Sequence, residues 1–73
     1  MENYRNLLGR NVRARREKLG LTQEQLGFET GLDRTYISGI ERGTRNPSLD
    51  VIVKIASALE TSPSGLLAKS DVE

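Results

Sequence analysis

The stretch TQEQLGFETGLDRTYISGIERG, residues 22–43, decides how this chain folds. It holds two short amphipathic segments with a break around Gly31, and each segment has its own helix-start signal. Thr22 followed by Gln25 matches a capping box, in which the threonine hydroxyl accepts a hydrogen bond from the N3 amide and the glutamine side chain bonds the cap amide. Asp33 offers a carboxylate to the free amides that begin the second segment. The stretch therefore predicts two helices joined by a tight turn.

Glycines stand at both expected helix ends. Gly31 and Gly43 suit the left-handed backbone that ends a helix, because glycine has no Cβ to clash there. Helix, short glycine turn, helix is the layout of a helix-turn-helix, whose second helix can lie in a DNA major groove. A plain αα-hairpin has the same layout.

The outward face of the second helix favours DNA reading over the plain hairpin. Ile37 and Ile40 supply the apolar contacts, and the other side chains are short, donor-rich and poor in acid. A merely solvated helix would more often carry glutamate and lysine at i,i+4 spacing. The candidate DNA contacts on and around this helix are Gln23, Arg34, Thr35, Tyr36, Ser38, Arg42, Arg45 and Asn46.

These candidates have different expected roles. Arg34 is expected to read guanine, because a guanidinium fits the O6 and N7 acceptors bidentately. Thr35 and Ser38 can bond base or phosphate, and the Thr35 methyl could also meet a thymine methyl group. Tyr36 is expected to bond a phosphate through its hydroxyl, although its ring could instead pack on a sugar or a thymine methyl group. Gln23 lies at a helix N-terminus, where free amides suit a phosphate, although a simple exposed position fits it too. The residues expected to anchor the DNA backbone are Arg42, Arg45 and Asn46.

The residues before the motif form one amphipathic helix over about residues 3–19. Arg16 continues the apolar line of this helix at the next turn, which places a charge near the core. Such a charge is costly unless it is paired and hydrogen-bonded. Glu41, one residue after Ile40, is the predicted partner. The predicted apolar stripe of the helix is Tyr4, Leu8, Val12 and Leu19.

Two more helices are predicted after the motif. Ser48 caps the first, and Ser62 followed by Pro63 begins a last short one. Within the motif, Leu26 is the expected core contact and Phe28 is expected to pack partly. The predicted stripe of the helix after Ser48 is Leu49, Ile52, Val53, Ala56 and Leu59, widened by Ile55.

The whole chain, residues 1–73, is thus predicted to be a single domain, an all-α five-helix bundle with frayed residues 70–73. It has no cysteine and no histidine, so disulfides and the usual zinc and general-base groups are missing. We expect no metal, no cofactor, no small-molecule ligand and no enzymatic activity. No apolar run approaches the roughly 20 residues of a membrane span, and no signal peptide is evident. We expect a cytoplasmic protein.

Charge is distributed unevenly along the chain. Residues 1–46 hold nine Lys/Arg against six Asp/Glu, whereas residues 47–73 hold two against four. The half with the motif is therefore the basic one, which supports a nucleic-acid face there.

A homodimer is expected, because one reading helix covers too few base pairs to specify a site. A two-fold dimer demands a pseudo-palindromic operator. Its interface is predicted in the acidic half, although the leucines there could instead close the monomer core. The predicted interface residues are Thr61, Ser62, Pro63, Ser64, Leu66 and Leu67.

Two neighbouring segments of this sequence resemble the Cro and phage-repressor type of helix-turn-helix regulator. They are GLDRTYISGIERG at residues 31–43 and RNPSL at residues 45–49. Within that lambda-repressor-like family it is most similar to the controller proteins of restriction–modification systems. The resemblance implies the Arg16–Glu41 pair, a phosphate contact for Gln23 and self-association through the C-terminal region.

The same resemblance implies a function. A controller would bind upstream of its own gene and of an endonuclease gene, activate at low occupancy and repress at high occupancy. RNA polymerase is a candidate partner in that case. The alternatives are a prophage-type repressor, a DNA-binding antitoxin and a module whose motif contacts protein.

Overall fold

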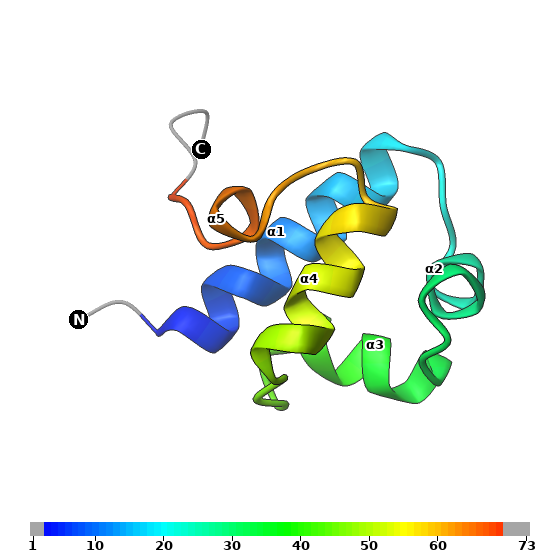
Figure 1. Ribbon diagram of the computed structural model, residues 1–73. Helices are drawn as coiled ribbons and strands as arrows, with labels where there is room; N and C mark the ends of the chain where they lie inside the picture. The colour runs from blue at the N-terminus through cyan, green and yellow to red at the C-terminus, as the bar shows by residue number, and fades with distance from the viewer. Residues whose placement is uncertain (1–2, 70–73) are drawn as a thin grey trace.

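The computed structural model describes residues 3–69, and this part of the chain is helical without strands. Figure 1 shows α2 and α5 on opposite sides of the bundle. α1 contacts α3 and α5, while α2 contacts α3 and α4. The predicted all-α five-helix fold is confirmed. The helices are α1 (Tyr4–Lys18), α2 (Gln23–Thr30), α3 (Arg34–Glu41), α4 (Leu49–Ala58) and α5 (Pro63–Leu66).

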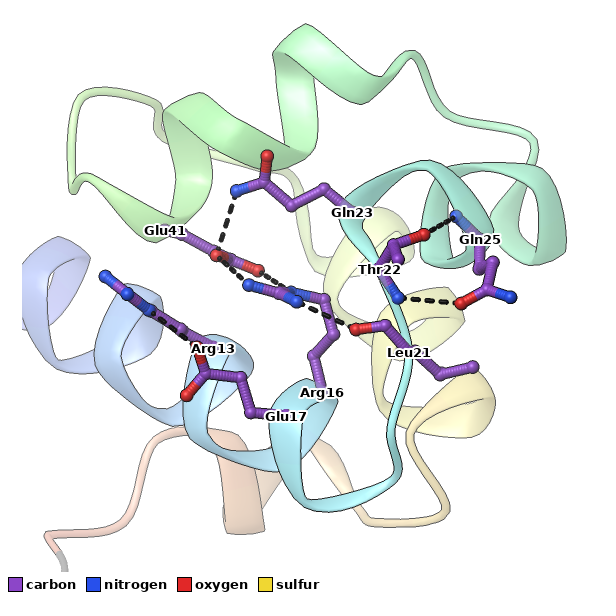
Figure 2. Close-up of polar contacts among 8 residues, drawn as sticks. All are labelled: Arg13, Arg16, Glu17, Leu21, Thr22, Gln23, Gln25 and Glu41. Atoms are coloured by element: carbon purple, nitrogen blue, oxygen red, sulfur yellow. Dashed lines mark hydrogen bonds and ion pairs between the residues drawn. The ribbon is translucent and has the colours of Figure 1, made fainter.

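The predicted helix-start signals form as hydrogen bonds. Thr22 Oγ1 accepts from the Gln25 amide at 3.0 Å, and Gln25 Oε1 accepts from the Thr22 amide at 2.8 Å (Figure 2). Asp33, Ser48 and Ser62 cap α3, α4 and α5 with their side chains. These bonds join residues two or three apart, so the local sequence suffices to predict them.

The core is formed by side chains from all five helices. Burying one aliphatic side chain such as leucine or isoleucine stabilises the fold by about 1.5–3 kcal/mol. Several such residues are therefore needed to offset the entropy that is lost when the chain becomes ordered. The buried cluster is Leu8, Val12, Leu26, Ile37, Ile40, Ile55, Ala56, Leu59 and Leu66.

Gly9 explains how closely α1 approaches α3. A Cβ at this position would lie 2.6 Å from the Glu41 carbonyl oxygen and closer still to that of Ile40. Glycine costs about 1 kcal/mol of helix propensity relative to alanine. The absence of a side chain lets the backbones meet where α1 supports α3.

Two predicted core residues, one in α1 and one in α2, need correction. Tyr4 is 61% exposed because it lies in the first turn of α1, whereas Leu7 is buried and was not predicted. Phe28 is 89% exposed. The buried side of α2 carries Leu26 and Thr30, one turn apart, and Phe28 lies two residues from each, about 200° around the helix.

The stripe predicted for α4 is also partly wrong. Leu49 and Val53 are 68% and 47% exposed, while Ile55 is fully buried. Ile55 and Leu59 therefore face the core, and Leu49 and Val53 are rotated away from it. α4 has more apolar residues than one face can bury, so the sequence leaves its rotation undetermined.

Polar side chains of α1 hold the C-terminal helices. Asn11 Nδ2 donates to the carbonyl oxygens of Leu66 and Ala68, each at 2.8 Å. Arg15 donates to the carbonyl oxygens of Leu59 and Glu60, each at 2.9 Å, and its charge suits the negative end of the α4 dipole.

Candidate nucleic-acid interface

The outward side of α3 carries the predicted reading residues. Ile37 and Ile40 are buried, so the opposite side of the helix faces solvent. At about 100° per residue, the side chains of Arg34, Thr35, Ser38 and Arg42 gather there. Arg34, Thr35 and Arg42 are exposed, and Ser38 is half-buried.

Thr35 is tied to the residue that caps α3. Its hydroxyl donates to Asp33 Oδ1 at 2.7 Å, and its amide donates to the same oxygen at 2.8 Å. Both bonds favour the carboxylate, and they lower the pKa of Asp33 below its ordinary value. The hydroxyl hydrogen of Thr35 is thus engaged by Asp33, so this hydroxyl can act towards a further group only as an acceptor.

Ser38 and Arg42 form a pair one turn apart. Arg42 Nη1 donates to Ser38 Oγ at 2.6 Å. The sequence predicts two independent contacts at these residues. In the structure a hydrogen bond joins their side chains on one side of α3.

The loop after α3 folds back onto the helix. The amide and the hydroxyl of Thr44 both donate to the Gly39 carbonyl oxygen, at 2.9 and 3.1 Å. The Arg45 guanidinium lies over the Tyr36 ring, 5.3 Å from its centroid, which is the geometry of a cation–π contact. Asn46 is exposed on the same loop. Sequence reasoning did not predict that Gly39 and Thr44 hold this loop against α3, and a glycine inside a short helix was the only signal.

The predicted ion pair of Arg16 and Glu41 is present (Figure 2). Arg16 Nε lies 2.7 Å from Glu41 Oε2, and Nη2 lies 3.0 Å from Oε1. Arg16 Nη1 also donates to the Leu21 carbonyl oxygen at 2.8 Å. The hydrogen bond to Glu41 raises the pKa of Arg16 above its ordinary value. The pair fixes the end of α3 to α1 and to the start of the motif.

Gln23 joins this pair in a way that the sequence did not indicate. Its Nε2 donates to Glu41 Oε1 at 3.0 Å, and the side chain is half-buried (Figure 2). One amide hydrogen is therefore used within the protein. Glu41 and Gly39 lie about 160° apart around α3, so Gln23 and Arg45 flank the helix on its two sides.

The predicted dimer residues differ in how far they are exposed at the surface of the monomer. Leu66 is 1% exposed and lies in the monomer core, so its side chain is not a surface contact. That part of the prediction is wrong, because α5 needs Leu66 to attach to the bundle. Leu67, Thr61 and Pro63 are half-buried, and Ser62 and Ser64 are exposed.

Residues 3–69 lack two other kinds of feature. That range contains no group of three or more His, Cys, Asp or Glu side chains that could hold a metal ion. Within the same range, no helix is long and apolar enough to cross a bilayer.

The fold and the exposed face of α3 define a helix-turn-helix domain. The helix-turn-helix family matches residues 12–66, and the chain belongs to this family. Control protein C.BamHI of Bacillus amyloliquefaciens is 56% identical over 66 residues, which cover 89% of this chain and 82% of the relative. Control protein C.SmaI of Serratia marcescens is 41% identical over 69 residues, covering 94% and 82%. The predicted resemblance to restriction–modification controllers is confirmed.

Solved structures agree with these relatives. The restriction–modification controller protein C.AhdI from Aeromonas hydrophila has a TM-score of 0.82 and 47% identity, covering 85% of this chain and 94% of that one. The controller protein C.Esp1396I was solved as a tetramer in complex with its natural 35 base-pair operator. Its TM-score is 0.80 at 35% identity, covering 90% of this chain and 87% of that one.

Proposed function

We propose that this protein is a sequence-specific DNA-binding transcriptional regulator, the controller of a restriction–modification system. The observation that carries the proposal is the donor-rich outward face of α3, which the Arg16–Glu41 pair holds against α1. The similarity to C.BamHI and to the operator-bound C.Esp1396I supports the same function.

In this proposal α3 enters the major groove. Arg34, exposed at the start of α3, reads a guanine, because its position leaves the guanidinium free to meet O6 and N7 together. Arg42 and Ser38 contact the DNA together, because a hydrogen bond joins their side chains. Thr35 contributes its methyl group or its oxygen, and Tyr36 contributes its hydroxyl to a phosphate. The residues that anchor the backbone on either side are Gln23, Arg45 and Asn46.

The protein acts as a homodimer on a pseudo-palindromic operator, with half-site centres about 34–36 Å apart. The interface comprises Thr61–Ser64 and Leu67, since Leu66 is used in the core. The protein is cytoplasmic. It controls its own gene and times the expression of the endonuclease, with RNA polymerase as a candidate partner.

Selection of bound duplexes from a random pool tests the proposal. We expect a two-fold symmetric site that also occurs upstream of the gene for this protein and of a neighbouring endonuclease gene. Recovery of no preferred duplex would overturn sequence-specific binding. Neighbouring phage genes, or a second polypeptide that co-purifies, would favour the prophage-repressor or the antitoxin alternative.

A further inference from the structure

Gly39 lies on the side of α3 that faces away from the core, and yet it is buried. The side chains that cover it belong to the loop after α3. A Cβ at Gly39 would lie 2.8 Å from Arg45 Cγ, 3.2 Å from Arg45 Nε and 3.3 Å from Thr44 Oγ1. Real Cβ atoms essentially never approach a carbon at 2.8 Å, so any side chain at position 39 displaces the stem of Arg45.

The position of this stem determines where the arginine charge lies. Tyr36 and Gly39 are three residues apart and are therefore neighbours on the helix surface. An arginine stem that crosses α3 at Gly39 carries its guanidinium onto the Tyr36 ring, where the centroid is 5.3 Å away. The charge is then held beside the outward face that bears Thr35 and Ser38.

We propose that Gly39 is a positioning residue for Arg45. The missing side chain opens a notch in α3 that holds the arginine stem. The stack on Tyr36 then fixes the position of the guanidinium before any ligand binds. Immobilising a long side chain on binding costs about 0.5–1.5 kcal/mol, which corresponds to roughly 2- to 10-fold in affinity. A pre-positioned Arg45 avoids that loss. This consequence for affinity depends on the proposed DNA binding, whereas the positioning itself does not.

Nuclear magnetic resonance of the free protein tests the positioning without DNA. We expect the side-chain protons of Arg45 to be shifted upfield by the ring current of Tyr36. Gly39→Ala should move these shifts to the values of a solvated arginine, and the fold should remain intact by circular dichroism. Unchanged Arg45 shifts in Gly39→Ala would overturn the proposal.

Operator binding tests the consequence. Gly39→Ala should weaken binding to the selected duplex by roughly 2- to 10-fold. In an Arg45→Ala background, the same change should cause no further loss, because the side chain that it displaces is gone. A full additional loss in that background would show that Gly39 acts through something other than Arg45.

Thr44→Val is the matched control for the loop. It removes the hydroxyl bond to the Gly39 carbonyl oxygen but keeps the amide bond and the side-chain shape. Affinity should stay close to that of the unmodified protein, and a loss as large as that of Gly39→Ala would assign the effect to Thr44 and overturn the proposal. If the unmodified protein binds no duplex at all, the proposed function fails, and the Arg45 shifts still decide the positioning.

Discussion

Arg16 of α1 donates two hydrogen bonds to the carboxylate of Glu41 in α3, from Nε at 2.7 Å and from Nη2 at 3.0 Å. Their side chains are 11% and 4% exposed, so the pair is nearly enclosed. Leu21 and Gln23 complete the set of bonds around it. Because one carboxylate connects α1, α3 and the first residue of α2, the pair couples the stability of the bundle to the placement of α3.

Glu41→Ala should destabilise the fold, because it leaves the Arg16 charge enclosed without its partner. Loss of one member of a buried pair typically costs about 3–5 kcal/mol. Replacing both residues with apolar ones of similar volume should recover much of this. Urea unfolding monitored by circular dichroism measures both changes.

The exposed pair of Arg13 and Glu17 is the control, with side chains 65% and 55% exposed. Glu17→Ala should change the free energy of unfolding by no more than about 0.5 kcal/mol. An unfolding midpoint of Glu41→Ala equal to that of the unmodified protein would contradict the structural role of the pair.

Arg34→Ala should weaken operator binding by about 1–3 kcal/mol and relax the preference at one base pair in each half-site. Arg45→Ala should weaken binding to all sequences more evenly, if it contacts phosphate alone. Both variants should remain folded, since both side chains are exposed. Binding curves on the selected site and on single-substituted sites distinguish the two patterns. Normal operator binding by Arg34→Ala would remove α3 from the reading role.

Binding should depend strongly on salt. The logarithm of the affinity should fall linearly with the logarithm of the salt concentration, with a slope of about −0.9 for each phosphate neutralised. The excess of basic residues in residues 1–46 motivates this expectation. Titrations at several salt concentrations measure the slope, and Arg45→Ala should reduce it by about 1. An affinity that is insensitive to salt would favour a protein partner for α3.

Asp33 should lose its capping role in acid. Its pKa is lowered by the bonds from the hydroxyl and the amide of Thr35, so its folded pKa lies below the unfolded one. Its contribution to stability is therefore present above the unfolded pKa and is lost as the pH falls through the folded pKa. A carboxyl titration by nuclear magnetic resonance should show the pKa of Asp33 rising in Thr35→Val. The same pKa in both proteins would show that the hydroxyl bond is not formed in solution.

Leu67→Glu should give a folded monomer with an operator affinity far below that of the unmodified protein. Leu67 is half-buried beside the core residue Leu66, and a charge there should oppose burial against a second copy. Phe28→Glu is the control, because Phe28 is 89% exposed on α2, across the bundle from α5 (Figure 1). Sedimentation velocity should show a dimer for the control only. An unmodified protein that stays monomeric at high micromolar concentration and on DNA would refute the dimer.

The sequence by itself determined the helix ends, the helix-turn-helix and the family. Helix caps such as Thr22, Asp33 and Ser48 bond residues two or three positions away. Their formation therefore depends on the local sequence and not on how the helices pack. The Arg16–Glu41 pair was also predictable, because a charge in an apolar line demands a partner.

Only the tertiary structure decided which faces were buried and how the DNA-contact candidates are held. Whether Leu49 or Ile55 faces the core depends on where the other helices lie against α4, and apolar periodicity does not specify that position. The bond of Gln23 to Glu41 and the stack of Arg45 on Tyr36 join residues from separate segments. Such contacts form after the helices pack, because the backbone must first bring the side chains within reach.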